Sequence, residues 1–183
     1  MRIVAGRAKG RRLAVPATGT RPTSDRAREA LFSSVDALLD LDGARVLDLF
    51  AGTGAVGLEA LSRGAVEAVL VESDRAAADL LRRNAATVAL PGARIVRRPV
   101  AAFLATEPGP PFDLVFADPP YALEDTVVAE LLATLVDGGW LADQAVVVVE
   151  RSARGAGPAW PDGVTPLRDR RYGEGVLWYG RRQ

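Results

Sequence analysis

Short apolar runs that alternate with segments of helical periodicity are the feature that most limits the fold of this chain. In runs such as VLDLF, AVLVE, DLVFA and AVVVVE the apolar residues are mostly consecutive and do not alternate with polar ones. Strands of this kind have helices over both faces, which is typical of parallel sheets. The predicted strands are Arg45–Phe50, Ala68–Glu72, Ala93–Arg97, Leu114–Ala117 and Ala145–Glu150, and the predicted helices are Ala55–Ser62, Arg75–Val88, Val100–Thr106 and Leu123–Val136. This alternation, with right-handed crossovers, predicts an α/β fold with a doubly wound, mostly parallel sheet.

The two ends of the chain depart from this alternation. Leu167–Arg171 and Val176–Tyr179 flank the turn sequence YGEG and predict a hairpin, which gives a seven-stranded sheet with an antiparallel edge. At the other end, residues 1–20 predict a short β-hairpin extension that is broken by glycines. Ser24 then offers the N-cap of a helix that runs to about Leu39.

The net charge of zero conceals an asymmetry along the chain. Residues 1–28 carry eight basic side chains against Asp25 alone, whereas the remaining residues carry 15 basic and 22 acidic side chains. A basic segment on an acidic body is the electrostatic pattern of a nucleic-acid contact, because cations that neutralise phosphates release counterions. We therefore expect a basic, nucleic-acid-binding extension at residues 1–22 and a separate domain at residues 23–183. The candidate phosphate ligands are Arg7, Lys9, Arg11 and Arg12.

Cysteine and histidine are both absent from the sequence. Their absence excludes disulfide bonds, thiolate nucleophiles, zinc sites built on these residues and mechanisms that use imidazole as a base. Chemistry must then use carboxylates, hydroxyls, backbone groups or a cofactor, and we expect no bound metal. No apolar run approaches the ~20 residues of a membrane span, and the N-terminus lacks the apolar segment of a secretory signal. We therefore expect a cytoplasmic protein with no membrane partner.

A glycine-rich turn follows the first predicted strand and leads into a helix. Gly52, Gly54 and Gly57 match the dinucleotide pattern G-x-G-x-x-G, in which glycines let a ligand approach the backbone closely. Glu72 closes the next strand, where its carboxylate can accept hydrogen bonds from a ribose diol. These features predict a cofactor that contains adenosine, and a nicotinamide dinucleotide remains one of the candidates. Asp48, inside the first strand, would repel a pyrophosphate but suits S-adenosylmethionine, whose ammonium and sulfonium groups are cationic.

The fourth predicted strand ends in the tetrapeptide Asp118-Pro119-Pro120-Tyr121. Its prolines fix the backbone and remove N–H donors, so the turn presents carbonyl acceptors next to the Asp118 carboxylate. Two acceptors, the carboxylate and the Pro119 carbonyl, suit an exocyclic amine of a nucleobase, because accepting both N–H bonds favours a tetrahedral nitrogen with a free lone pair. That nitrogen could attack a methyl group on a sulfonium, while Tyr121 stacks on the extruded base. Catalysis would rest on positioning and electrostatics, and this turn alone does not separate guanine N2 from adenine N6.

These motifs resemble those of class I S-adenosylmethionine-dependent methyltransferases that act on exocyclic amines. The blocks AGRAKGRRL, TRPTSDRAREALF, DLFAGTGAVGLEALSRGA and RRYGEGVLWY resemble the bacterial small-subunit ribosomal RNA guanine-N2 methyltransferases (the RsmD-like family) over nearly the whole chain. The resemblance implies a Rossmann-like class I methyltransferase fold and methyl transfer from S-adenosylmethionine to guanine N2 of 16S rRNA. The partner would be 16S rRNA within a small-subunit assembly particle, and we expect a monomer. The alternatives are an adenine-N6 methyltransferase of DNA or RNA, a nicotinamide oxidoreductase and a non-catalytic ribosome-assembly factor.

The resemblance also implies roles for individual positions. It places Asp48, Phe50, Ala51, Gly52, Thr53 and Gly54 around the methionine part of the cofactor, Glu72 at the ribose, Ser73 beside the adenine, and Arg21 and Thr23 at the N-terminal side of the pocket. After the third strand this chain has Arg98-Pro99 where the family usually has Gly-Asp. Adenine recognition is therefore expected either to rely on backbone groups near Val100 or to be weaker.

Overall fold

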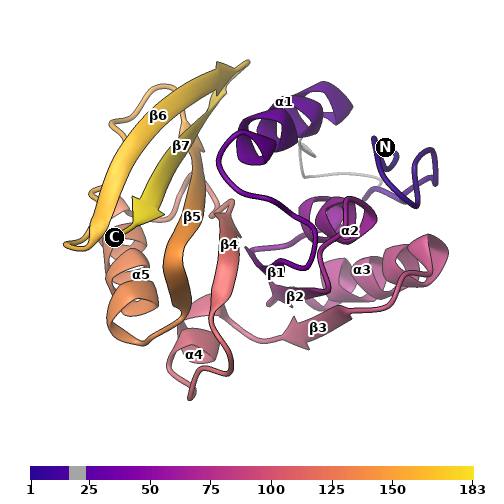
Figure 1. Cartoon of the computed structure of the whole chain (residues 1–183), viewed down its shortest axis with the longest axis horizontal. Coiled ribbons are helices and arrows are strands. Elements are labelled where there is room, and N and C mark those ends of the chain that lie inside the picture. The colour runs from indigo at the N-terminus through magenta and orange to yellow at the C-terminus, as the bar shows by residue number, and fades with distance from the viewer. Residues whose placement is uncertain (17–23) are drawn as a thin grey trace.

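The computed structural model describes residues 1–16 and 24–183, which form one sheet with helices on both faces (Figure 1). The strands are β1 (Arg45–Leu49), β2 (Glu67–Glu72), β3 (Ala93–Arg97), β4 (Phe112–Ala117), β5 (Leu141–Ser152), β6 (Val164–Tyr172) and β7 (Gly175–Arg182), in the order β3-β2-β1-β4-β5-β7-β6. The strands β1 to β5 pair in parallel, whereas β7 pairs antiparallel with both β5 and β6. The predicted seven-stranded, mostly parallel sheet with an antiparallel edge hairpin is confirmed.

Helices cover the two faces of the sheet and create two buried apolar clusters. The helices α1 (Asp25–Asp36), α2 (Ala55–Ser62) and α3 (Arg75–Val88) lie on one face, and α4 (Val100–Leu104) and α5 (Asp125–Asp137) lie on the other (Figure 1). Phe32 and Leu81 belong to the first cluster, and Phe103 belongs to the second. Neighbouring residues of β1 alternate between the two, Val46 in the first and Leu47 in the second, which explains the unbroken apolar run. Among the described residues, no helix has both the length and the apolar character to cross a bilayer.

The N-terminal residues 1–16 pack into the apolar cluster on the α1–α3 face. Ile3 and Leu13 are both buried there. The hairpin predicted for residues 1–20 is present in a shorter form, as an antiparallel bridge between Arg2 and Arg12, and residues 17–20 lie outside the described part of the chain.

Side chains of α2 explain why the strands of this hairpin do not extend. The Glu59 carboxylate accepts hydrogen bonds from the backbone N–H groups of Val4 (2.7 Å) and Ala5 (2.9 Å). The Ser62 hydroxyl accepts one from the N–H of Ala8 (2.9 Å). Backbone donors that a hairpin would pair across its strands are therefore satisfied by a helix that lies more than fifty residues later in the sequence.

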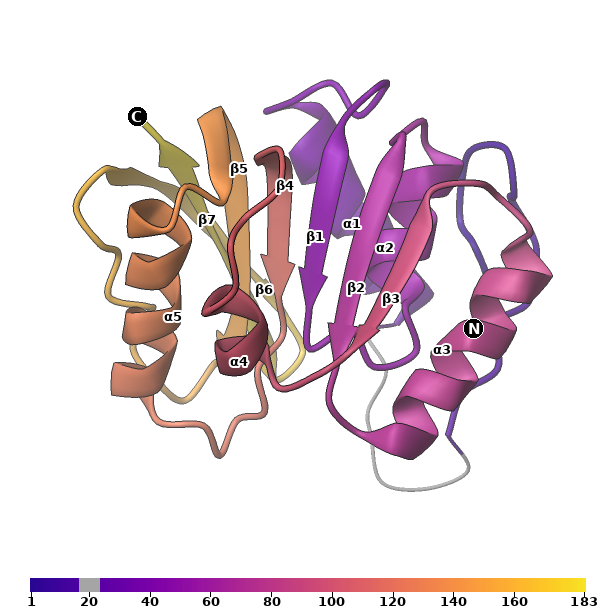
Figure 2. The same ribbon diagram turned by 90° about the horizontal axis from the view of Figure 1, so that it is seen from below.

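The parallel strands bring the predicted motifs to one edge of the sheet. Leu49 at the end of β1 pairs with Val71 of β2 and with Ala117 of β4. Figure 2 shows β1 to β4 running in the same direction, so their carboxyl ends meet at one edge. The glycine turn follows β1, the Asp-Pro-Pro-Tyr turn follows β4, and Glu72 ends β2. Doubly wound sheets bind their ligands at this edge.

Candidate active site

A cavity of about 1420 Å³ lies at the carboxyl edge of the sheet. Its wall contains most residues that the sequence predicted for the cofactor and the target base, namely Asp48, Phe50, Ala51, Gly52, Thr53, Glu72, Ser73, Asp118, Pro119, Pro120 and Tyr121. Residues of α1 and the turn between β6 and β7 complete the wall. The two motifs therefore face one space, which is large enough for a nucleotide-sized ligand and a nucleobase together.

The turn after β1 has an unusual backbone that shapes the cavity floor. Phe50 has a φ of 61°, a left-handed conformation that is costly for a bulky side chain and is typical of functional turns. Gly54, with a φ of 78°, is the N-cap of α2 and lies behind the wall, where a Cβ would come within 2.9 Å of Leu81 Cγ. A Cβ at Gly57 would lie 2.7 Å from Leu70 Cδ2. The glycines therefore seat α2 directly on the sheet and leave the loop backbone exposed to a ligand.

Asp48 is a buried carboxylate in the cavity wall. Its Oδ2 accepts a hydrogen bond from the Gly57 N–H at 2.9 Å, which holds the side chain against the start of α2. Burial raises the pKa of Asp48 to about 7; this hydrogen bond opposes the rise and the charge of Glu72 adds to it. An acidic group whose ionised form is costly is stabilised by a bound cation, so this position favours a positively charged ligand.

Glu72 is held in one orientation by two backbone donors. Its Oε2 accepts from the Gly52 N–H at 2.8 Å, and its Oε1 accepts from the Asp74 N–H at 2.8 Å. Each carboxylate oxygen can accept a further hydrogen bond. The side chain is thus fixed at the end of β2 with acceptor capacity left for a diol.

Asn84 on α3 is a supporting residue that the sequence analysis missed. Its buried amide donates to the carbonyls of Thr53 (2.9 Å) and Ala14 (3.0 Å), and its Oδ1 accepts from the Ala14 N–H (2.8 Å). It links the glycine turn, α3 and the N-terminal segment. An asparagine inside a helix gives no local signal of such a role, because both partners are remote in sequence.

Asp118 lines the cavity directly after the end of β4. Its backbone N–H donates to the Leu49 carbonyl at 3.3 Å, which ties the turn after β4 to the end of β1. Burial and the nearby charges of Glu150 and Asp48 raise the pKa of Asp118 to about 8, and Arg151 opposes this rise. Tyr121, at the end of the same turn, is 49% exposed and lines the same cavity.

Arg151 anchors the Asp-Pro-Pro-Tyr turn, although the sequence analysis gave it no role. Its buried guanidinium donates to the carbonyls of Pro120 (3.3 Å) and Leu123 (2.8 Å) and to Asp125 Oδ1 (2.7 Å). The sequence indicated a strand that ends at Glu150, whereas β5 continues to Ser152 and carries Arg151 to the turn. A rigid turn thus depends on an arginine from the neighbouring strand.

The remaining predicted residues lie away from the cavity or outside the described part of the chain. Val100 begins α4 with its side chain buried in the α4–α5 cluster, and it is not part of the cavity wall. Arg21 and Thr23 lie outside the described residues.

Two of the four candidate phosphate ligands bind helix ends. The Arg7 guanidinium donates to the Leu61 carbonyl at 3.0 Å, and that of Arg11 donates to the Val88 carbonyl. Both carbonyls belong to the C-terminal turns of α2 and α3, at the ends remote from the glycine turn, where cations are favourable. All four residues are exposed.

Comparison with known proteins places this site in a family. Residues 1–181 match the family model described as Conserved hypothetical protein 95. Ribosomal RNA small subunit methyltransferase D of Escherichia coli K12 is 44% identical over 162 residues, which cover 88% of this chain and 79% of that protein. The chain belongs to the family of ribosomal RNA small subunit methyltransferase D.

Solved structures agree with membership of the small subunit methyltransferase D family. The Escherichia coli protein yhhF superposes with a TM-score of 0.89 at 38% identity, over 100% of this chain and 98% of that chain. Magnesium protoporphyrin IX methyltransferase (ChlM) from Synechocystis PCC 6803, solved with bound S-adenosylmethionine, shares the fold with a TM-score of 0.68 at 13% identity, over 86% of this chain and 79% of that chain. The predicted Rossmann-like methyltransferase fold is confirmed.

Proposed function

We propose that this chain transfers a methyl group from S-adenosylmethionine to the exocyclic N2 of a guanine in 16S rRNA. The observation that carries the proposal is that one cavity joins the acidic pocket at Asp48 and Glu72 to the acceptor pair at Asp118 and Pro119. The first suits a cationic methyl donor, and the second suits a conjugated amine. Membership of the small subunit methyltransferase D family supports ribosomal RNA as the substrate. We extend the proposal to a cytoplasmic monomer that acts on a small-subunit assembly particle.

The donor set of the cavity fits S-adenosylmethionine better than a dinucleotide. The wall carries the carboxyl groups of Asp48, Glu72, Asp74, Asp118, Glu150 and Glu174. A pyrophosphate would add negative charge to this set, whereas an ammonium and a sulfonium would reduce its repulsion. When bound, S-adenosylmethionine supplies an electrophilic methyl group on a cationic sulfur. Asp48 would hold the methionyl ammonium, and Glu72 would hold the ribose hydroxyls.

The turn after β4 would prepare the amine for attack. The Asp118 carboxylate and the Pro119 carbonyl accept its two N–H bonds and orient its lone pair toward the methyl group. The Arg151 contacts keep both acceptors in place, so the turn is organised before the base arrives. Burial and nearby carboxylates raise the pKa of Asp118 to about 8 in the protein alone, and a bound cation favours its ionised form, which can accept the amine and then take up the proton that the methylated nitrogen releases.

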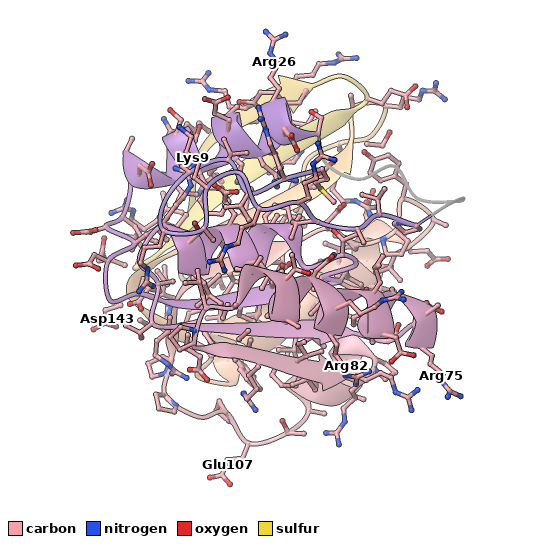
Figure 3. All side chains as sticks on the ribbon, turned by 90° about the vertical axis from the view of Figure 1, so that its right-hand side faces the viewer. Lys9, Arg26, Arg75, Arg82, Glu107 and Asp143 are labelled. Carbon is pink, nitrogen blue, oxygen red and sulfur yellow. The ribbon has the colours of Figure 1, made fainter. Side chains whose placement is uncertain are left out.

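Exposed arginines around the cavity support binding of a polyanion. Arg26 on α1, Arg83 on α3 and Arg171 on β6 all line the wall and are exposed. Within residues 1–16 and 24–183, none of the three has an ion-pair partner. Figure 3 shows Arg26 pointing outward from the molecule. These side chains would bind phosphates on either side of an extruded guanine, with the N-terminal basic residues forming a separate second contact.

The test is methyl transfer to ribosomal RNA from cells that lack the gene, presented both as free 16S rRNA and as small subunits. We expect mass spectrometry of the digested RNA to find one new N2-methylguanosine. The Asp118→Asn variant should react about 100-fold more slowly or worse, as for loss of one oriented group in an active site, and should still bind S-adenosylmethionine. Appearance of N6-methyladenosine, or no transfer to either substrate, would contradict the proposal.

A further inference from the structure

Glu150 is a second carboxylate beside Asp118, and the chemistry proposed so far gives it no role. The strands β4 and β5 pair in parallel with Ala117 opposite Val149, so the next residue of each strand, Asp118 and Glu150, lies side by side at the carboxyl edge. Both side chains belong to the cavity wall. The influence of the Glu150 charge on the pKa of Asp118 agrees with this proximity.

The Glu150 carboxylate also lies close to the residue expected to stack on the base. A Cβ placed on Gly175 of β7 would lie 2.7 Å from Glu150 Oε1 and 3.1 Å from Tyr121 Oη, so both atoms approach the same point on β7. Glu150 is therefore next to Asp118 along the edge of the sheet, and its carboxylate approaches the Tyr121 hydroxyl. A base held by both of those residues would present its Watson–Crick edge to Glu150.

The two candidate bases differ at the atom next to their exocyclic amine. Guanine has an N1–H beside its N2 amine, so this part of its edge offers only donors. Adenine has an N1 lone pair beside its N6 amine, so its edge offers a donor and then an acceptor. A carboxylate next to the acceptor pair accepts the guanine N1–H, whereas it repels the adenine lone pair and finds no donor there.

We propose that Glu150 determines base specificity: its carboxylate accepts the N1–H of the guanine whose N2 amine is held by Asp118 and Pro119, and it thereby rejects adenine. This inference rests on the proposed function, and it supplies the discrimination that the Asp-Pro-Pro-Tyr turn lacks. Glu150 has other contacts in the folded chain. A carboxylate can accept several hydrogen bonds at once, so those contacts are compatible with binding a base.

The experiment replaces the mapped target guanosine of a synthetic RNA with 2-aminopurine riboside, which keeps the N2 amine and lacks the N1–H. We compare kcat/KM for the two RNAs in the parent enzyme and in Glu150→Gln, whose amide can donate to an unprotonated N1. The ratio of kcat/KM for the guanosine RNA to kcat/KM for the 2-aminopurine RNA should fall roughly tenfold to a hundredfold in the variant, the range for one charge-assisted hydrogen bond. The loss of the O6 oxygen affects both enzymes equally, so it cancels from this comparison.

The control variant is Glu174→Gln, which removes another carboxylate of the same cavity wall from the turn between β6 and β7. The ratio of kcat/KM for the two RNAs should be the same in this variant as in the parent. An unchanged ratio in Glu150→Gln would overturn the inference. Should that variant not fold, the parent enzyme is given RNA with 1-methylguanosine at the target, and methylation at the rate of guanosine would also overturn it. Failure of the proposed function is distinguishable, because the parent would then form no N2-methylguanosine on unmodified RNA.

Discussion

Replacing Arg151 with methionine should loosen the Asp-Pro-Pro-Tyr turn while leaving the cofactor half of the cavity intact. The guanidinium is buried, and it joins β5 to the carbonyls of Pro120 and Leu123 and to Asp125. Methionine keeps much of the apolar stem and removes every donor. The substitution therefore tests the anchoring of the turn with little change in packing volume.

The loss of stability in Arg151→Met can be divided among the three contacts of the guanidinium. The Asp125 side chain is 64% exposed, so its ion pair with Arg151 contributes no more than about 1 kcal/mol. The Pro120 carbonyl keeps a second donor, the Leu123 N–H at 2.8 Å, and its bond to Arg151 is long at 3.3 Å. The short bond to the Leu123 carbonyl contributes most, about 1.5–3 kcal/mol for a charged donor. We expect a total loss of about 2–4 kcal/mol in the free energy of unfolding.

Urea unfolding and steady-state methyl transfer measure the two consequences. We expect kcat/KM to fall roughly tenfold to a hundredfold, because the acceptors lose their fixed position, while calorimetry finds the affinity for S-adenosylmethionine unchanged. The matched control, Asp125→Asn, removes only the exposed ion pair and should cost about 1 kcal/mol or less. Arg151 does not anchor the turn if Arg151→Met is no less stable than Asp125→Asn, or if it transfers methyl groups at the parent rate.

Two further predictions concern the charges of the cavity. Burial raises the pKa of Asp48 from its ordinary 3.8 to about 7, so the unfolded chain releases this proton first and the ligand-free protein should lose stability between pH 4 and pH 7. Asp48→Asn should reduce that fall in melting experiments and leave the part due to Asp118, whose pKa is also raised. In the parent the affinity for S-adenosylmethionine should increase between pH 5.5 and 7, and a pH-independent affinity would contradict the assigned cation site. Alanine at Arg26, Arg83 or Arg171 should each lower the slope of log affinity for RNA against log salt by about one. Arg94→Ala, at the opposite edge of the sheet, should leave the slope unchanged, and equal effects at all four positions would argue against a localised RNA contact.

Local sequence signals were sufficient to predict the helices that follow the glycine turn and Glu72. The boundaries of Ala55–Ser62 and Arg75–Val88 agree with prediction, because a glycine turn and the Asp74 side chain, which accepts from the Ala77 N–H at 2.8 Å, begin these helices. The N-terminal hairpin was predicted less well, because its donors bind Glu59 and Ser62 of a distant helix. Local pattern cannot reveal partners of that kind.

The same limit applies to the site. Residues at the ends of parallel strands, such as Asp48, Glu72 and Asp118, were found because chain topology alone brings them to one edge. Arg151 and Asn84 were missed because their roles consist of contacts with backbone carbonyls far away in sequence. Supporting residues of this type become visible only when the register of the sheet is known.

The charge asymmetry of the sequence illustrates how folding changes the meaning of a linear pattern. Among the basic residues near the N-terminus, Arg28 is completely buried and bonds to Asp25 at 2.8 Å, while Arg7 and Arg11 bind helix C-termini. The buried Arg28 is thus withdrawn from any RNA contact, whereas Arg7 and Arg11 are exposed and keep their charge at the surface while they bind these carbonyls. Charge also differs with depth in the cavity wall: Asp48 is buried and Glu72, Asp118 and Glu150 are half-buried, whereas the arginines of the wall are exposed. Under the proposed function, these carboxylates would attract a cationic donor inward and the arginines would hold a polyanion outside, with only its neutral base entering the cavity, so one neutral chain would bind two substrates of opposite charge.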